Sequence, residues 1–164
     1  MKYNKSLTAT VYIVKDKRVL LHKHKKYNTW FPVGGHLKEN ELPHMGAIRE
    51  AKEESGLEIS LFQKNEDSFS VGLVERVPSP VAIYHEGIGG KEEFLDFIYI
   101  GIPEEGEISP EEGESSVFRW FSESELLDKE ENIKIHIRNT ALKCLYLIKN
   151  KDGEYFPAHE NAIY

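Results

Sequence analysis

The chain has 164 residues, of which 40% are hydrophobic and 11% aromatic, which suits one domain with its own core and excludes a disordered chain. The formal net charge is −7, and a protein of that sign repels nucleic acid and anionic lipid, so a phosphate-bearing substrate would need positive charge from elsewhere, such as a metal ion. The single cysteine, Cys144, excludes an intramolecular disulfide and lies among leucines, which predicts a buried, inert thiol.

The residue pattern predicts alternating strands and helices along the whole chain. In chain order these are strands over 8–14 and 19–24, a helix over 43–55, strands over 57–62, 69–74, 81–84, 94–100 and 117–121, a short helix after Ser122, and a long helix over 133–148. Pro43 suits the first turn of a helix and Gly56 its left-handed end, whereas Leu42 is a poor N-cap. Ser122 with Glu125 predicts a capping box.

Polar and glycine-rich segments separate these elements. Residues 87–90 predict a turn that either hinges a lid or is a plain turn, and residues 104–116 predict an acidic loop. Strands with helices at the middle and the end of the chain predict an α+β sandwich. The chain start lacks the apolar run of a signal peptide, and no apolar stretch reaches the roughly 18 residues of a membrane span, so we expect a cytoplasmic protein.

Three glutamates of the predicted helix over 43–55 lie close together. Glu50, Glu53 and Glu54 occupy positions i, i+3 and i+4, which places them within an arc of about 100° on one helix face. Like charges at these spacings destabilise a helix. The cluster is either an ordinary exposed acidic face or a site for a hard cation such as Mg2+, which binds carboxylate and phosphate oxygens.

Neighbouring residues favour the cation site. Arg49 can hold a carboxylate through its two-pronged guanidinium group. Gly34 and Gly35 lie upstream and would let the backbone come close to a metal ion or a phosphate.

The segment over residues 35–57 resembles the Nudix box, G-x5-E-x7-R-E-U-x-E-E-x-G-U, in which U is apolar. The matching residues are Gly35, Glu41, Arg49, Glu50, Glu53, Glu54 and Gly56, with Ala51 and Leu57 at the apolar positions. The resemblance implies the Nudix fold, in which a mixed β-sheet is sandwiched between helices (α/β/α), as a single domain over residues 1–164. It also implies an enzyme that hydrolyses a phosphorus anhydride in a nucleoside diphosphate linked to another group, with Mg2+ or, alternatively, Mn2+.

The resemblance also implies roles for individual residues. The metal ligands would be the carboxylates of Glu50, Glu53 and Glu54 and the backbone carbonyl of Gly34. Either Glu50 or Glu53 would also act as the catalytic base, and Arg49 would orient a catalytic glutamate.

Three other box residues would be structural: Gly35, Glu41 and Gly56. Glu41 would brace the loop by pairing with the arginine of the box. Many Nudix enzymes use a further acid outside the box, for which we choose Glu114 first and Glu112 second. The alternative for both is a solvated acidic loop.

Four residues are candidates for substrate contacts. His22 and His24 lie two apart in a predicted strand, so they face the same side and either contact phosphates or are simply exposed. His36 follows the glycine pair and could line the site. Trp30 either stacks on a base or anchors the core.

The expected substrate is a small nucleotide, and a nucleoside triphosphate pyrophosphohydrolase is our first hypothesis. The alternatives are a nucleotide-sugar or ADP-ribose diphosphatase, an enzyme that acts on capped or triphosphate RNA ends, and a Nudix module that binds a nucleotide without turnover. The acidic charge argues against a long nucleic acid partner. A homodimer is expected by analogy with the family, and residues 75–93 match no motif that would fix the substrate.

Overall fold

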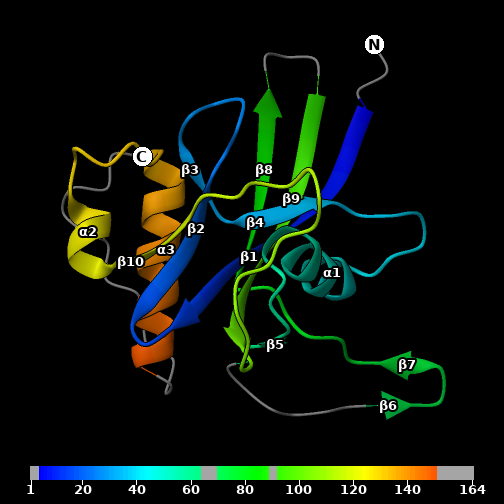
Figure 1. The fold of residues 1–164 in the computed structure, drawn as a ribbon. Helices are drawn as coiled ribbons and strands as arrows, with labels where there is room; N and C mark the ends of the chain where they lie inside the picture. Colours follow the sequence, from blue (N-terminus) through cyan, green and yellow to red (C-terminus); the bar gives the residue numbers. More distant parts are fainter. Residues whose placement is uncertain (1–3, 64–69, 89–91, 151–164) are drawn as a thin grey trace.

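Two long strands that run parallel, β1 (Asn4–Lys15) and β9 (Glu92–Pro103), form the centre of the β-sheet. A computed structural model describes residues 4–63, 70–88 and 92–150 and is drawn in Figure 1. The sheet order is β10 (Phe118–Ser122), β2 (Arg18–Lys23), β1, β9 and β5 (Ile59–Leu61), with β3 (Trp30–Phe31) on β2, β4 (Val33–His36) on β1, and β8 (Ala82–Ile88) on β9. These other pairs are antiparallel, which confirms the mixed sheet.

Side chains alternate between the two faces of β1, as the strand period requires. Ala9, Val11 and Ile13 are buried on the face that packs against helix α1 (Pro43–Ser55). Tyr12 and Val14 are buried on the opposite face. There the core includes residues of α2 (Glu123–Leu127) and α3 (Ile135–Lys149), so the predicted α/β/α sandwich is confirmed (Figure 1).

Helix α1 has the predicted bounds and the predicted ends. Pro43 occupies the first turn, and Gly56 ends the helix in the left-handed conformation, with φ of 76°. Leu42 makes no side-chain capping bond. Ala47 and Ala51 are fully buried, and because their side chains are small, α1 can lie close to the sheet.

The second half of the chain differs from prediction mainly at element boundaries. Ser122 and Glu125 form the predicted capping box of α2. Helix α3 begins at Ile135 rather than 133, because Ile133 forms an isolated bridge with Trp30. Cys144 is fully buried, as predicted, and burial raises the pKa of its thiol. No helix in the described ranges has the length and apolar character needed to cross a bilayer.

Two sequence predictions were wrong in detail. The predicted strand over 69–74 is a hairpin of β6 (Ser70–Val71) and β7 (Val74–Glu75), because Gly72, with φ of 60°, turns the chain; residue 69 lies outside the described residues. Gly87, predicted to open a turn, continues β8, which pairs with β9. Residues 89–90 of that predicted turn lie outside the described residues.

Replacing Phe121 by alanine should lower the free energy of unfolding by about 3–5 kcal/mol, because a large buried ring leaves a cavity. Phe121 is fully buried and packs edge-on against Trp30, with ring centroids 5.0 Å apart. Urea unfolding would measure the loss. Leu127→Ala is the control, since Leu127 is half exposed and its truncation should cost less than about 1 kcal/mol. Equal losses in the two variants would contradict the packing.

Candidate functional site

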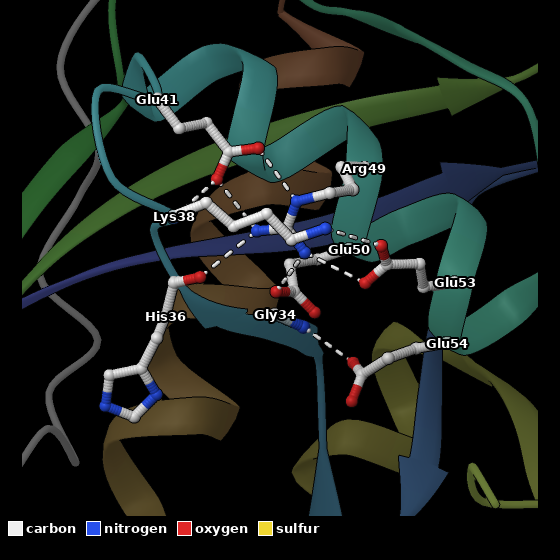
Figure 2. A network of polar contacts seen from close by, with 8 residues as sticks. All are labelled: Gly34, His36, Lys38, Glu41, Arg49, Glu50, Glu53 and Glu54. Carbon is white, nitrogen blue, oxygen red and sulfur yellow. Dashed lines mark hydrogen bonds and ion pairs between the residues drawn. The ribbon is translucent and has the colours of Figure 1, made fainter.

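Helix α1 lies against β4, which brings the glutamates of the helix to the glycine pair. The Gly34 amide donates a hydrogen bond to Glu54 Oε2 over 2.7 Å (Figure 2). A Cβ atom on Gly35 would lie 2.7 Å from Glu50 Oε1, and one on Gly34 would lie 2.6 Å from the Ala9 carbonyl oxygen. Glycine at both positions therefore permits the close approach of strand, helix and carboxylates.

The Arg49 guanidinium holds three carboxylates in place (Figure 2). Its Nη1 donates to Glu50 Oε1 over 2.6 Å and to Glu53 Oε2 over 2.9 Å. Its Nε and Nη2 each donate to Glu41 over 2.8 Å, in the two-pronged geometry that is strongest between arginine and a carboxylate. Nη2 also donates to the His36 carbonyl over 3.1 Å. The arginine therefore joins the loop before the helix to the acid cluster.

The acids differ in burial and in charge balance. The side chains of Glu50 and Glu54 are 12% and 16% exposed, and that of Glu53 is 32% exposed. Burial raises the pKa of Glu54 to about 7, and the charges of nearby glutamates add to this rise. The hydrogen bond from the Gly34 amide lowers the pKa, but by less than burial and these charges raise it. Burial also raises the pKa of Glu50, against the hydrogen bond from Arg49. Two partly buried carboxylates thus lie together with too little positive charge around them.

This donor set fits a hard divalent cation. Mg2+ and Mn2+ bind carboxylate oxygens and backbone carbonyl oxygens. A divalent ion would also offset the negative charge of the glutamates. Among the described residues, no three acidic, histidine or cysteine side chains lie close enough together to form a ready metal site. Arg49 instead bridges Glu50 and Glu53. Lys38 Nζ contributes a second ion pair to Glu53, at 3.2 Å.

The acidic loop over residues 104–116 docks on the end of α1. The amides of Ser109 and Glu111 donate over 2.9 Å to the carbonyls of Ser55 and Glu53, which the helix end leaves without partners. A Cβ on Gly56 would collide with the Ser109 carbonyl, so glycine allows this approach as well as the left-handed turn.

The docked loop brings Glu114 to the acid cluster. The Glu114 charge contributes, after burial, to the raised pKa of both Glu50 and Glu54. Glu112 is exposed. Ser115, next to Glu114, donates to the Lys23 carbonyl over 2.9 Å, which ties the loop to β2. The structure therefore places the first-choice acid near the cluster.

Three of the four candidate substrate residues lie in different surroundings. His22 is buried rather than exposed, with Nε2 4.0 Å from Glu54 Oε2, and burial lowers its pKa to about 4. His24 packs against Tyr27, with ring centroids 4.7 Å apart. Trp30 lies against the core ring of Phe121, the arrangement expected of an anchor.

His36 borders a pocket of about 290 Å3 on the α3 face of the sheet. The residues lining it are Thr8, Thr10, Tyr12, Phe31, Pro32, Gly34, Gly35, His36, Tyr84, Glu86, Phe94, Asp96, Ile98, His136 and Ile137. Thr8 and Thr10 alternate with Ala9 and Val11, which explains why they face away from α1. Asp96, which lines this pocket, is not among the residues predicted from the sequence; its only signal was one acid inside the apolar strand over 94–100.

Comparisons with known proteins bear on the family and the fold. The family model for the NUDIX domain matches residues 5–141. A hydrolase of the NUDIX family from Clostridium perfringens is 32% identical, with a TM-score of 0.76 over 88% of this chain and 99% of that chain. A NUDIX hydrolase from Nitrosomonas europaea is 17% identical, with a TM-score of 0.66 over 93% of this chain and 98% of that chain. A MutT NUDIX hydrolase from Burkholderia pseudomallei is 21% identical, with a TM-score of 0.63 over 85% of this chain and 97% of that chain. At these lower identities the likeness is one of fold alone. Curated protein sequences gave no match.

Replacing Glu41 by glutamine should destabilise the protein at pH 7 and make little difference in strong acid. The hydrogen bonds from Arg49 lower the pKa of Glu41 from 4.5 to about 2. Its stabilising effect is therefore complete above about 4.5 and is lost as the pH falls through about 2. We expect a loss on the order of 1–3 kcal/mol at pH 7, measured by urea unfolding. A stability difference between wild type and variant that does not shrink between pH 5 and pH 2 would contradict this.

Proposed function

We propose, from the premise that the chain belongs to the Nudix family and is a hydrolase of pyrophosphate bonds, that it cleaves the diphosphate linkage of a small nucleotide with the help of Mg2+. The observation that carries the proposal is that Glu50 and Glu54 lie against the glycine pair, while Arg49 positions Glu50 and Glu53 and the Glu114 charge acts on Glu50 and Glu54. A nucleoside triphosphate is the first substrate to test.

The proposed roles follow from these positions. Glu50, Glu53 and Glu54, with the Gly34 carbonyl, would hold Mg2+ or Mn2+. When bound, the ion neutralises the charge by which a diphosphate repels nucleophiles. Glu50 or Glu53 would accept the proton of the attacking water, with Arg49 keeping either carboxylate in a defined orientation. Attack on phosphorus proceeds in line with the leaving phosphate.

Four further assignments stay predictions. A small nucleotide suits a pocket of about 290 Å3 next to the glycine pair better than a long nucleic acid does, given the net charge of −7. A nucleotide sugar or ADP-ribose is the alternative substrate. A homodimer, a cytoplasmic location and a single domain over residues 1–164 are expected on the grounds given above. A module that binds without turnover is disfavoured because every glutamate of the box is present.

Glu53→Gln should lower kcat/KM by roughly 100-fold or more, because the amide neither accepts a proton nor binds Mg2+ as a carboxylate does. Phosphate or pyrophosphate release would be measured with Mg2+ and a panel of nucleoside triphosphates, dinucleoside polyphosphates and nucleotide sugars. The control is Glu58→Gln, which removes an exposed carboxylate near the same helix end. Full activity of the Glu53 variant, or activity that persists in excess chelator, would overturn the proposal.

Glu114→Gln should lower kcat at least about tenfold while leaving the fold intact, because Glu114 supplies negative charge to the acid cluster. Glu112→Gln is the matched control in the same loop, since Glu112 is exposed. Steady-state kinetics with saturating Mg2+ would compare the two. Equal activities of both variants would show that the loop acid has no part in the reaction.

A further inference from the structure

Asp96 is an ionisable residue buried in the middle of β9, where the residue is 7% exposed. A carboxylate in such a place is costly unless hydrogen bonds satisfy it. Thr8 Oγ1 donates to Oδ1 over 2.9 Å, and Thr10 Oγ1 donates to Oδ2 over 2.8 Å. The parallel register of β1 and β9 sets Thr8 beside Asp96. Burial raises the pKa of Asp96, and the two hydroxyls oppose that shift by donating to the charged form.

The Asp96 carboxylate borders the pocket beside the glycine pair. Each carboxylate oxygen accepts one threonine hydrogen bond and has a further lone pair. Among the described residues, the pocket lining includes neither lysine nor arginine, and Glu86 adds a second acid. In the described part of the chain, only Thr8 and Thr10 donate hydrogen bonds to the Asp96 carboxylate, so its remaining lone pairs are left for donors that a ligand supplies.

The rest of the pocket suits a flat ring. Phe31, Tyr84 and Phe94 line it, and the Tyr84 hydroxyl is held by the Thr140 hydroxyl at 2.9 Å. Strands β1, β9 and β8 lie side by side (Figure 1). All three contribute residues to the pocket, and the start of α3 adds His136 to its lining. At its other edge are Gly34 and Gly35, next to the acid cluster. A nucleotide with its diphosphate at the acids would have its base within reach of this pocket.

We propose that Asp96 selects the base of the substrate by accepting hydrogen bonds from two adjacent N–H donors, the pattern that guanine presents at N1 and its 2-amino group. The nucleotide class rests on the proposed function. Hypoxanthine keeps the N1 donor and lacks the amino group, and adenine presents an acceptor at N1. A base that cannot donate leaves the remaining lone pairs of the buried carboxylate unpaired, which costs affinity. Reading of a base edge between aromatic rings is a known solution in nucleotide pockets.

Binding of GMP, IMP and AMP to the full chain tests the proposal. These monophosphates have no anhydride, so calorimetry or NMR titration measures affinity without turnover. We expect GMP to bind about tenfold or more tightly than IMP or AMP. Asp96→Asn should bring the three dissociation constants within about twofold of one another. The control is Asp16→Asn, which removes the same charge at an exposed turn where φ is 48°, a conformation that asparagine tolerates. This variant should keep the wild-type preference.

Two results would overturn the proposal. Equal wild-type affinities for the three monophosphates would do so even if the Asp96 variant fails to fold. Equal weakening of all three ligands in Asp96→Asn would show that Asp96 only ties β1 to β9. Failure of the proposed hydrolysis is separate: a preference for GMP together with absent turnover in Mg2+ would retain the base selection and reject the reaction.

Discussion

The set of hydrogen bonds from Arg49 to three glutamates is the interaction on which the site depends. Glu50, Glu53 and Glu54 would repel one another on a bare helix. Arg49 offsets that repulsion for two of them and uses its remaining donors on Glu41 and the His36 carbonyl. The same side chain thus makes the acid cluster tolerable and ties the preceding loop to the helix. Lysine could not replace it, because a single ammonium lacks the planar set of donors that reaches several carboxylates at defined angles.

The sheet separates the acid cluster on one face from the pocket with Asp96 on the other. Helix α1 packs on one face and brings its acids to the strand that carries the glycine pair. The pocket with Asp96 opens on the opposite face, beneath the start of α3. Gly34 and Gly35 belong to both regions, because β4 borders the pocket while its glycines touch the acids. A substrate that spans this edge would place its diphosphate and its base in different surroundings: charged at one end, aromatic at the other.

The placement of Glu114 shows how far local reasoning could reach. Its candidacy rested on position in an acidic loop, and the structure places it near the cluster because the loop amides bond to the free carbonyls at the end of α1. The last carbonyls of any helix lack partners within the helix, but only the tertiary structure decides which segment donates hydrogen bonds to them. His22 illustrates the opposite case. Its strand spacing predicts either a phosphate contact or simple exposure, and the fold excludes the exposure by burying it beside Glu54.

The sequence by itself determined the bounds of α1, the spacing of its acids and the capping box of α2, because each depends on residues within one or two helical turns. It also determined the family, since the box is one continuous segment. Only the tertiary structure decided the pocket: Thr8 and Asp96 are 88 positions apart and meet because β1 and β9 run parallel. Parallel pairing leaves no turn signal between its strands, so the partner of a strand cannot be deduced from the residues that flank it.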